Sequence, residues 1–375
     1  MPLIEIGRRS AEPGLSDWLE HWRIDSWLLL LLLLVSALGL IVLYSASGHD
    51  MDAVIAQGKR LMLGMVVMIA VAQAPPEWYR TISPWLYGVT AVLLILVLLL
   101  GDAAKGAQRW LDLGVIRFQP SELMKLAMPM VIAAYLHHRL LPPSVGTMAL
   151  TLLLIGLPAG LVMQQPDLGT ALLIIGAGGF ALFFAGLRWR WILGAVGAVA
   201  AAAPILWHQL HDYQRGRILT LFDPERDPLG AGYHITQSKI AIGSGGLFGK
   251  GWLEGTQAKL DFLPEAHTDF IFAVIAEEFG LIGALFLLML YLAIVGRGLV
   301  IAMRAQDTFQ RLLAAALSLK FFVYVFINIG MVIGLLPVVG VPLPLISYGG
   351  TSAVSLLAGF GMLMSIQTHR KLLSN

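Results

Sequence analysis

Long apolar runs separated by short polar connections dominate the chain. Seven of them approach or exceed the roughly 20 residues that a helix needs to cross a bilayer; they are Trp27–Tyr44, Trp85–Leu100, Leu168–Leu187, Trp191–Leu206, Phe270–Met303, Leu312–Leu336 and Leu345–Ile366. Three further segments are shorter or carry charges, namely Lys59–Ala74, Gln119–Tyr135 and Thr147–Met163. The pattern predicts an all-α polytopic membrane protein with about ten transmembrane helices. No repeat of fixed period interrupts it, so residues 1–375 are interpreted as one membrane domain.

Composition supports this interpretation and removes several function classes. Hydrophobic residues make up 58% of the chain, charged residues 13%, and the mean hydropathy is +0.78. The net charge of +2 is too small to indicate a nucleic-acid partner. Cysteine is absent from the sequence, which excludes disulfides, thiolate metal sites and thiol catalysis.

The basic residues predict an orientation. Arg8, Arg9 and Arg23 precede the first run, and the Arg-bearing connections after it alternate along the chain. Lys and Arg are enriched in cytoplasmic loops, so we expect residues 1–24 to be a cytoplasmic tail and both termini to be cytoplasmic. Five basic residues fall on the opposite side and are exceptions to this pattern: Lys59, Arg60, Lys105, Arg109 and Arg117.

The largest polar segment, residues 208–268, separates the seventh and eighth predicted helices. This orientation places it outside the membrane on the extracytoplasmic side. Asp223–Gly230 is rich in Asp-Pro and Gly and predicts consecutive turns. Tyr233–Ile242 can form a short amphipathic helix, and the glycine-rich stretch Gly243–Gly251 predicts a flexible or backbone-exposing loop.

Ionisable side chains within apolar spans are energetically expensive and face a partner or a wet cavity. Glu122 and Lys125 are three residues apart on one helical face and can pair, either as a structural contact or as part of a substrate site. Glu277, Glu278 and Lys320 are interpreted as packing or helix-end charges, with a cavity-lining role as the alternative.

Carboxylates at predicted helix starts have two interpretations. Asp167 precedes Leu-Gly-Thr and is expected to cap a helix N-terminus. Asp269 stands where the long polar segment meets the eighth helix, so either Thr268 or Asp269 could begin that helix, and Asp269 could also be catalytic. His267 could orient a substrate or bond the loop. No His pair has the spacing and Glu of a zinc helix, so no metal or cofactor is assigned, and any requirement for a divalent ion is left open.

Six ordered strings resemble the SEDS family (shape, elongation, division and sporulation proteins). They run from the second extracytoplasmic loop to the last span and are Lys105–Leu111, Phe118–Glu122 with Lys125, Gln165–Thr170, Asp227–Tyr233, Phe262–Phe272 and Pro342–Gly350. Any one of these strings alone would be a weak signal, whereas their order and coverage together are specific.

The resemblance implies a ten-helix enzyme of the bacterial inner membrane that polymerises the lipid-linked cell-wall precursor lipid II into glycan during cell elongation and rod-shape maintenance. The essential carboxylate of the family falls on Asp269, as general base or charge stabiliser facing the periplasm. The loop Arg and Trp of the family match Arg109 and Trp110, and its membrane Glu/Lys pair matches Glu122 and Lys125. The resemblance also implies a class B penicillin-binding protein as partner.

The chemistry of this transfer suggests further roles for polar residues. A sugar attached to diphosphate already carries a good leaving group, so the enzyme must orient an acceptor hydroxyl, remove its proton and stabilise the departing diphosphate. Arg109, Lys125 or Lys239 could bind diphosphate or peptide carboxylates, and Glu122 could hold Lys125 in place. Trp110 could stack on a sugar, and His267 could contact substrate. Two alternatives remain: a flippase of the same precursor, with Glu277, Glu278 and Lys320 lining its path, and a non-catalytic scaffold for the penicillin-binding protein.

Overall fold

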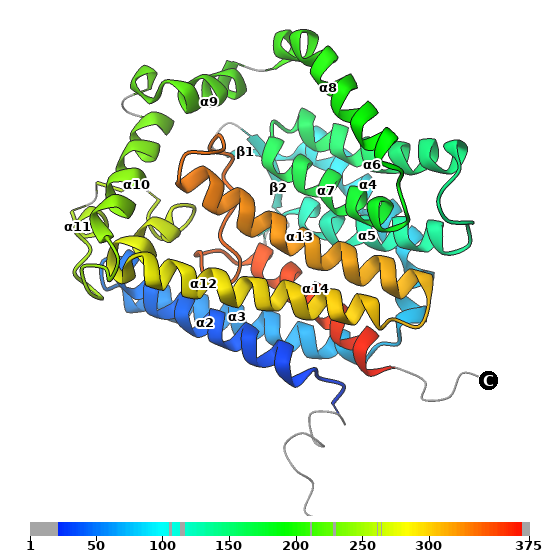
Figure 1. Cartoon of the computed structure of the whole chain (residues 1–375), viewed down its shortest axis with the longest axis horizontal. Helices are drawn as coiled ribbons and strands as arrows, with labels where there is room; N and C mark the ends of the chain where they lie inside the picture. Colours follow the sequence, from blue (N-terminus) through cyan, green and yellow to red (C-terminus); the bar gives the residue numbers. More distant parts are fainter. Residues whose placement is uncertain are drawn as a thin grey trace, which may run out of the picture.

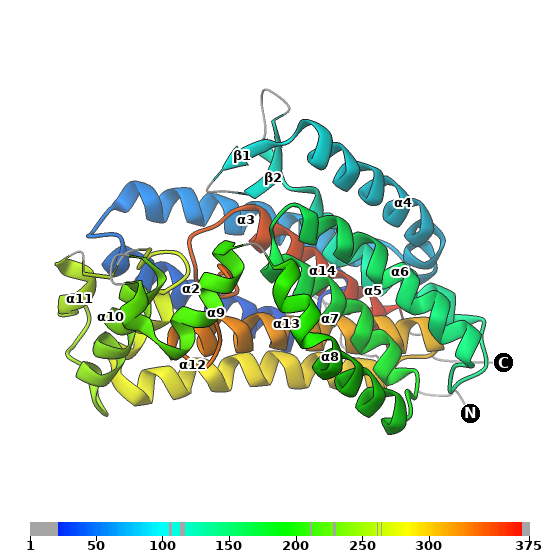
Figure 2. The ribbon, with the colours of Figure 1, turned by 90° about the horizontal axis from the view of Figure 1, so that it is seen from above.

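The computed structural model describes residues 22–104, 107–112, 117–210, 212–227, 230–260, 262–263 and 265–369. Most of the predicted tail, residues 1–24, lies outside the described residues. The chain folds as a bundle of long helices with a small sheet at the end of α4 and three shorter α-helices between α8 and α12 (Figures 1 and 2). The prediction of an all-helical membrane architecture is therefore confirmed in its main features, with the small sheet as an addition.

Each of the ten predicted spans corresponds to one long helix of the described chain. These helices are α2 (Ser26–Ala46), α3 (Met51–Gln73), α4 (Pro76–Leu100), α5 (Pro120–His137), α6 (Val145–Gln164), α7 (Leu168–Phe184), α8 (Trp189–Gln209), α12 (Ile271–Met303), α13 (Thr308–Val332) and α14 (Thr351–Thr368). Among the described residues, seven helices are long and apolar enough to cross a membrane: α2, α3, α4, α6, α12, α13 and α14. Helix α7 is apolar but shorter. The number of crossings stays a prediction.

Three predicted helix starts differ from the structure, for identifiable reasons. Helix α3 begins earlier than predicted, at Met51, because Asp50 caps it by accepting hydrogen bonds from the backbone N–H groups of Asp52 and Ala53. Helix α4 also begins earlier, because Pro76 occupies a first-turn position that tolerates proline. Helix α14 begins later, since residues 333–350 fold as a loop.

Three short strands after α4 form an antiparallel sheet that was not predicted from the sequence. Its strands are β1 (Asp102–Ala104), β2 (Ala107–Asp112) and β3 (Arg117–Phe118), in the order β1-β2-β3. Strands this short carry too few alternating positions to be read from sequence. The sheet holds Arg109 and Trp110 between α4 and α5.

The predicted polar segment 208–268 contains more helix than expected. It holds α9 (Asp212–Phe222), a 3-10 turn η1 (Pro224–Arg226), α10 (Ala231–Gly245) and α11 (Thr256–Lys259). The predicted amphipathic helix is thus present and longer at both ends. Helix α10 packs on α12, and α9 and α10 lie at one end of the bundle (Figure 1).

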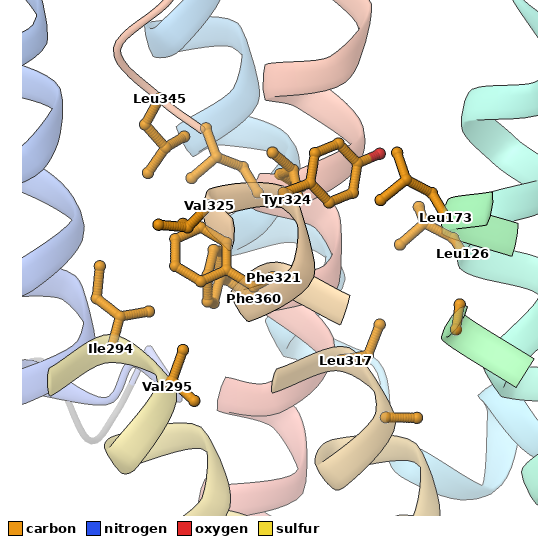
Figure 3. Close-up of a cluster of buried hydrophobic side chains, with 14 of the residues drawn as sticks. Leu126, Leu173, Ile294, Val295, Leu317, Phe321, Tyr324, Val325, Leu345 and Phe360 are labelled. Atoms are coloured by element: carbon orange, nitrogen blue, oxygen red, sulfur yellow. The ribbon is translucent and has the colours of Figure 1, made fainter. Parts of the chain in front are cut away.

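The hydrophobic core lies where α12, α13 and α14 meet α2, α5 and α7. Phe321 of α13 packs edge-on against Phe360 of α14, with ring centroids 5.1 Å apart (Figure 3). Phe321 also packs edge-on against Tyr291 of α12. The Tyr291 hydroxyl donates a hydrogen bond of 2.8 Å to the Pro344 carbonyl, which ties the loop before α14 to the core. This core fixes the elements that carry the candidate site.

Helix α12 is broken at Gly280, where φ is 66° and ψ is −164°. The glycine-rich segment 246–251 supplies the missing backbone hydrogen bonds. Lys250 and Gly251 donate to the carbonyls of Glu277 and Glu278, each at 3.0 Å, and the N–H groups of residues 281 and 282 donate to the carbonyls of residues 246 and 247. The predicted backbone-exposing loop therefore uses its backbone to repair a broken helix.

The two buried carboxylates beside this break hold the same loop. Glu277 accepts hydrogen bonds from the Lys250 Nζ at 2.7 Å and from the Thr256 N–H at 2.8 Å. Glu278 accepts a hydrogen bond from the Ser45 hydroxyl of α2. Both residues are thus packing charges, as the first interpretation held, and neither lines the cavity described below.

Gly280→Ala is expected to lower the free energy of unfolding by at least about 2 kcal/mol, because an L-residue at positive φ is strained. The added Cβ would also lie 2.3 Å from the Gly249 backbone nitrogen. Thermal unfolding in detergent measures the effect. Gly296→Ala in the same helix is the control, since a Cβ there meets nothing within 4 Å; equal stability of the two variants would contradict the prediction.

Candidate active site

A cavity of about 210 Å³ opens at the end of the bundle where α5 and α7 begin. Its walls come from β2, the first turns of α5 and α7, helix α13 and the loop before α14. The charged and aromatic side chains that line it are Arg109, Trp110, Glu122, Lys125, Asp167 and Tyr324. Segments far apart in the sequence therefore bring four of the predicted site residues to one cavity.

Arg109 is held by the cap of α7. Its Nε lies 3.0 Å from Asp167 Oδ2, while Asp167 Oδ1 accepts the Thr170 N–H at 3.2 Å. The predicted N-terminal cap is confirmed, and the same carboxylate also orients a cation. Arg109 keeps 32% of its side chain exposed, so part of its five-donor guanidinium stays available to an anion in the cavity.

The predicted pair between Glu122 and Lys125 is confirmed. Lys125 Nζ donates to Glu122 Oε1 at 2.6 Å, and the Ser355 hydroxyl of α14 donates to Glu122 Oε2 at 2.7 Å. Lys125 Nζ also lies 5.1 Å from the centroid of the Tyr324 ring. The ammonium is thus held at the cavity wall between a carboxylate and an aromatic face.

Tyr324 is a lining residue that the sequence analysis missed. It sits in the second half of α13, and its hydroxyl points towards Leu173 of α7, which lines the same cavity (Figure 3). Its ring closes the core side of the cavity. A polar aromatic residue inside an apolar span is the only sequence signal that could have marked it.

Lys320 of α13 contacts the backbone of Lys125, the lysine that lines the cavity. Its buried Nζ donates a hydrogen bond of 3.2 Å to the Lys125 carbonyl. In a regular helix that carbonyl would accept from the N–H of residue 129, but residue 129 is proline and has none. Lys320 therefore satisfies a buried carbonyl that Pro129 leaves without its helical partner. Its role is structural, as the packing interpretation predicted.

Lys320→Met is expected to lower the free energy of unfolding by roughly 1–3 kcal/mol, because it leaves a buried carbonyl unpaired. Pro129→Ala restores the N–H that this carbonyl lacks, so in that background the same substitution should cost much less. Thermal unfolding of the wild type, both single variants and the double variant measures the coupling. Costs that simply add would contradict the assignment.

Asp269 lies beside the cavity, immediately before α12. Asn328 of α13 donates hydrogen bonds of 2.8 Å to the carbonyls of Asp269 and Val341, which fixes the Asp269 backbone against the loop before α14. A Cβ added at Gly340, a lining residue, would lie 3.4 Å from Asp269 Oδ2. The half-buried Asp269 is not among the residues that line the cavity, but its carboxylate lies next to one of them and so stands at the cavity edge.

The helix-cap interpretation of Thr268 and Asp269 is wrong. Helix α12 begins at Ile271 with Phe270 as its N-cap, and no side chain caps it. The Thr268 hydroxyl instead donates to Glu265 Oε2 at 2.7 Å. Because the last turn before the helix is held by backbone and loop contacts, the Asp269 carboxylate is not needed for helix initiation.

The remaining predicted residues lie outside the cavity lining. His267 is exposed and packs edge-on against Tyr348, with ring centroids 6.0 Å apart. Lys239 on α10 lies against Gly334, where an added Cβ would come within 2.7 Å of its Nζ. Asp269, which directly follows the polar segment, therefore lies closer to the cavity lining than these two side chains do.

Arg60 of α3 is a second residue that the sequence analysis did not assign to the site. Its guanidinium lies 4.4 Å from the centroid of the Tyr348 ring. Its side chain also packs against Gly350, a lining residue. The sequence signal that could have marked Arg60 is that it is an exception to the Lys/Arg orientation pattern.

A family model described as "Cell cycle protein", for FtsW, RodA and SpoVE, matches residues 25–372. The chain belongs to the SEDS family. The resemblance of the six sequence strings is therefore confirmed, and it extends over nearly the whole SEDS chain.

Two curated relatives illustrate the range of similarity. The peptidoglycan glycosyltransferase MrdB of Escherichia coli strain K12 is 54% identical over 363 residues, which are 96% of this SEDS chain and 98% of that relative. The probable peptidoglycan glycosyltransferase FtsW of Geobacter metallireducens is 38% identical over 367 residues, covering 94% and 96%.

Solved structures share the fold. A chain of a peptidoglycan synthase complex, described as coordinating polymerization and crosslinking, matches with a TM-score of 0.82 and 34% identity, covering 93% of this SEDS chain and 98% of that chain. The rod shape determining protein RodA of Thermus thermophilus matches with a TM-score of 0.71 and 30% identity, covering 92% and 98%.

Proposed function

We propose that this SEDS protein is a peptidoglycan glycosyltransferase that polymerises lipid II at the cavity beside Asp269. The observation that carries the proposal is the meeting of a carboxylate, two cations and a tryptophan at one end of a membrane bundle. Two curated relatives bear this activity in their names. The acceptor hydroxyl would reach Asp269 while the diphosphate lies near Arg109 and Lys125.

The proposed reaction uses one proton acceptor and two cationic groups. The acceptor oxygen attacks the anomeric carbon, the bond from that carbon to the diphosphate oxygen breaks, and the hydroxyl proton passes to the Asp269 carboxylate. Arg109 and Lys125 balance the charge that develops on the departing diphosphate. Trp110 offers an apolar face to a sugar ring.

The size of the cavity limits what it encloses. Its volume of about 210 Å³ is below the range of roughly 300–1,000 Å³ typical of pockets that surround a drug-sized ligand. The site therefore holds the reacting groups, and the polyprenyl tail and the growing strand must extend from it. A tail that stays in the bilayer suits a cavity at the end of membrane helices.

The partner and the orientation are part of the proposal. One relative of known structure belongs to a complex that couples polymerization and crosslinking, which supports a class B penicillin-binding protein as the partner here. We place the cavity at the periplasmic face of the inner membrane and both termini in the cytoplasm, because the Arg-bearing connections favour that orientation.

Purified protein with its penicillin-binding partner and labelled lipid II tests the function. Long glycan should form even when the partner's transpeptidase is inactive. Movement of lipid II across vesicle membranes without polymer formation would favour the flippase alternative. The absence of both activities would favour a scaffold. The flippase alternative has lost its main support, since Glu277, Glu278 and Lys320 all make protein contacts.

The orientation predicts which single introduced cysteines a reagent can reach. The native chain has no cysteine, so all labelling comes from the introduced residue. Glu225→Cys is exposed at the proposed periplasmic end, and Gly146→Cys is exposed at the opposite end. In intact spheroplasts, a membrane-impermeant maleimide should label position 225 and should label position 146 only after permeabilisation. The reverse pattern would overturn the orientation.

A further inference from the structure

A larger cavity, of about 560 Å³, lies at the opposite end of α5 and α7 from the candidate active site. It is lined by the α5–α6 connection and by the α7–α8 connection. Helix α5 has 18 residues and is therefore about 27 Å long at 1.5 Å per residue. That length is close to the roughly 30 Å hydrocarbon thickness of a bilayer, so the cavity lies at the other membrane surface. We call it the distal cavity.

The distal cavity is lined by cations without carboxylates. Arg139, Arg188 and Arg190 contribute three guanidinium groups, and no Asp or Glu is among the lining residues. None of the three arginines forms an ion pair with a described residue. Two of them contact aromatic rings instead: Arg139 lies 5.2 Å from the Tyr135 ring centroid and Arg190 lies 5.6 Å from that of Trp191. Like charges therefore converge here, and no carboxylate of the described part of the chain pairs with them.

Neutral hydrogen-bond donors share the distal cavity with these cations. Helix α6 begins there, and its N-cap Ser144 and first-turn Thr147 both line it. The positive end of a helix dipole and its first N–H groups favour an anion. Trp191 adds an amphipathic ring of the kind enriched at membrane–water interfaces. The lining thus combines cations and hydrogen-bond donors, which bind phosphate, with a tryptophan ring, which can contact lipid.

Membrane topology alone does not explain the convergence. Arg304 and Arg311 lie at the α12–α13 connection on the same side of the bundle, and they satisfy the same charge bias without lining the distal cavity. Arg guanidinium groups match phosphate with paired donors. Basic pockets between transmembrane helices at a membrane surface bind lipid head groups. We propose that the distal cavity binds a phosphate-bearing anion, with an anionic phospholipid head group of that leaflet as the source.

Native mass spectrometry of the purified full chain tests the site. The added probes are phosphatidylglycerol, zwitterionic phosphatidylcholine and inorganic phosphate. Wild-type protein should retain phosphatidylglycerol in preference to phosphatidylcholine. Arg188→Gln with Arg190→Gln should weaken that retention by roughly 30-fold, from about 1 kcal/mol per basic residue at a membrane surface.

The matched control is Arg304→Gln with Arg311→Gln, which removes the same charge from the same side of the bundle. It should retain the lipid as the wild type does, and thermal unfolding should show that both double variants are folded. Displacement of the lipid by millimolar inorganic phosphate would identify the free anion as the ligand source while supporting the site. Equal retention in the two double variants, or no preference for phosphatidylglycerol, would overturn the proposal.

Discussion

Replacing Asp269 with asparagine is expected to lower the rate of lipid II polymerisation by at least about 100-fold, the lower end of what a positioned general base contributes. Asparagine keeps the size of the side chain but cannot take the acceptor proton. The backbone of residue 269 should stay in place, because it is its carbonyl that Asn328 holds. The measurement is the initial rate of glycan formation from labelled lipid II with the penicillin-binding partner present.

The control for this variant is Asp223→Asn, which removes an exposed carboxylate from the polar segment that precedes Asp269. Asp223 pairs only loosely with Arg226, at 3.6 Å, and lies away from the cavity lining, so its variant should polymerise at the wild-type rate. Both variants should unfold at the wild-type temperature. Normal polymerisation by Asp269→Asn would remove the carboxylate from the mechanism.

Replacing Glu122 with alanine is expected to lower the free energy of unfolding by about 3–5 kcal/mol, the usual cost of removing one partner of a buried ion pair. Lys125 would keep a buried positive charge, with only 4% of its side chain exposed, and would lose its carboxylate. The Ser355 hydroxyl would lose one of its two acceptors and keep the Ser352 carbonyl. Chemical or thermal unfolding in detergent measures the loss.

The double variant Glu122→Leu with Lys125→Met separates stability from function. Replacing both charges with apolar side chains of similar size removes the buried charge, so most of the stability should return. Polymerisation should remain low, because the cation proposed to face the diphosphate is absent. A double variant as unstable as Glu122→Ala would contradict the buried-pair argument, and one with normal polymerisation would exclude Lys125 from the site.

Hydropathy predicted the long helices because a span must be apolar over most of its length, whatever it packs against. Hydropathy did not predict the helix ends whose positions are set by capping residues and turns. Asp50 and Pro76 start α3 and α4 before the apolar runs begin. The sheet at residues 102–118 was missed because strands of two to six residues leave almost no periodic signal.

The sequence predicted which residues belong to the candidate site, but it did not predict how most of them contact one another. Sequence strings marked Asp269, Arg109, Glu122 and Lys125, and local spacing was enough for the pair between the last two. The pairing of Arg109 with Asp167 depends on the sheet, which no pattern revealed. The position of the Asp269 carboxylate next to Gly340, a residue that lines the cavity, depends on how the loop before α14 packs against the start of α12.

What the sequence by itself determined was the membrane fold, the family and the chemical groups available for the reaction, since these follow from hydropathy and from ordered local motifs. Only the tertiary structure decided what the buried charges do. Lys320 completes the hydrogen bonding that Pro129 removes from a residue 195 positions away along the chain, and Glu277 holds the loop that repairs the break at Gly280. Such roles depend on which backbone groups are left unpaired when helices pack, and no local pattern records that.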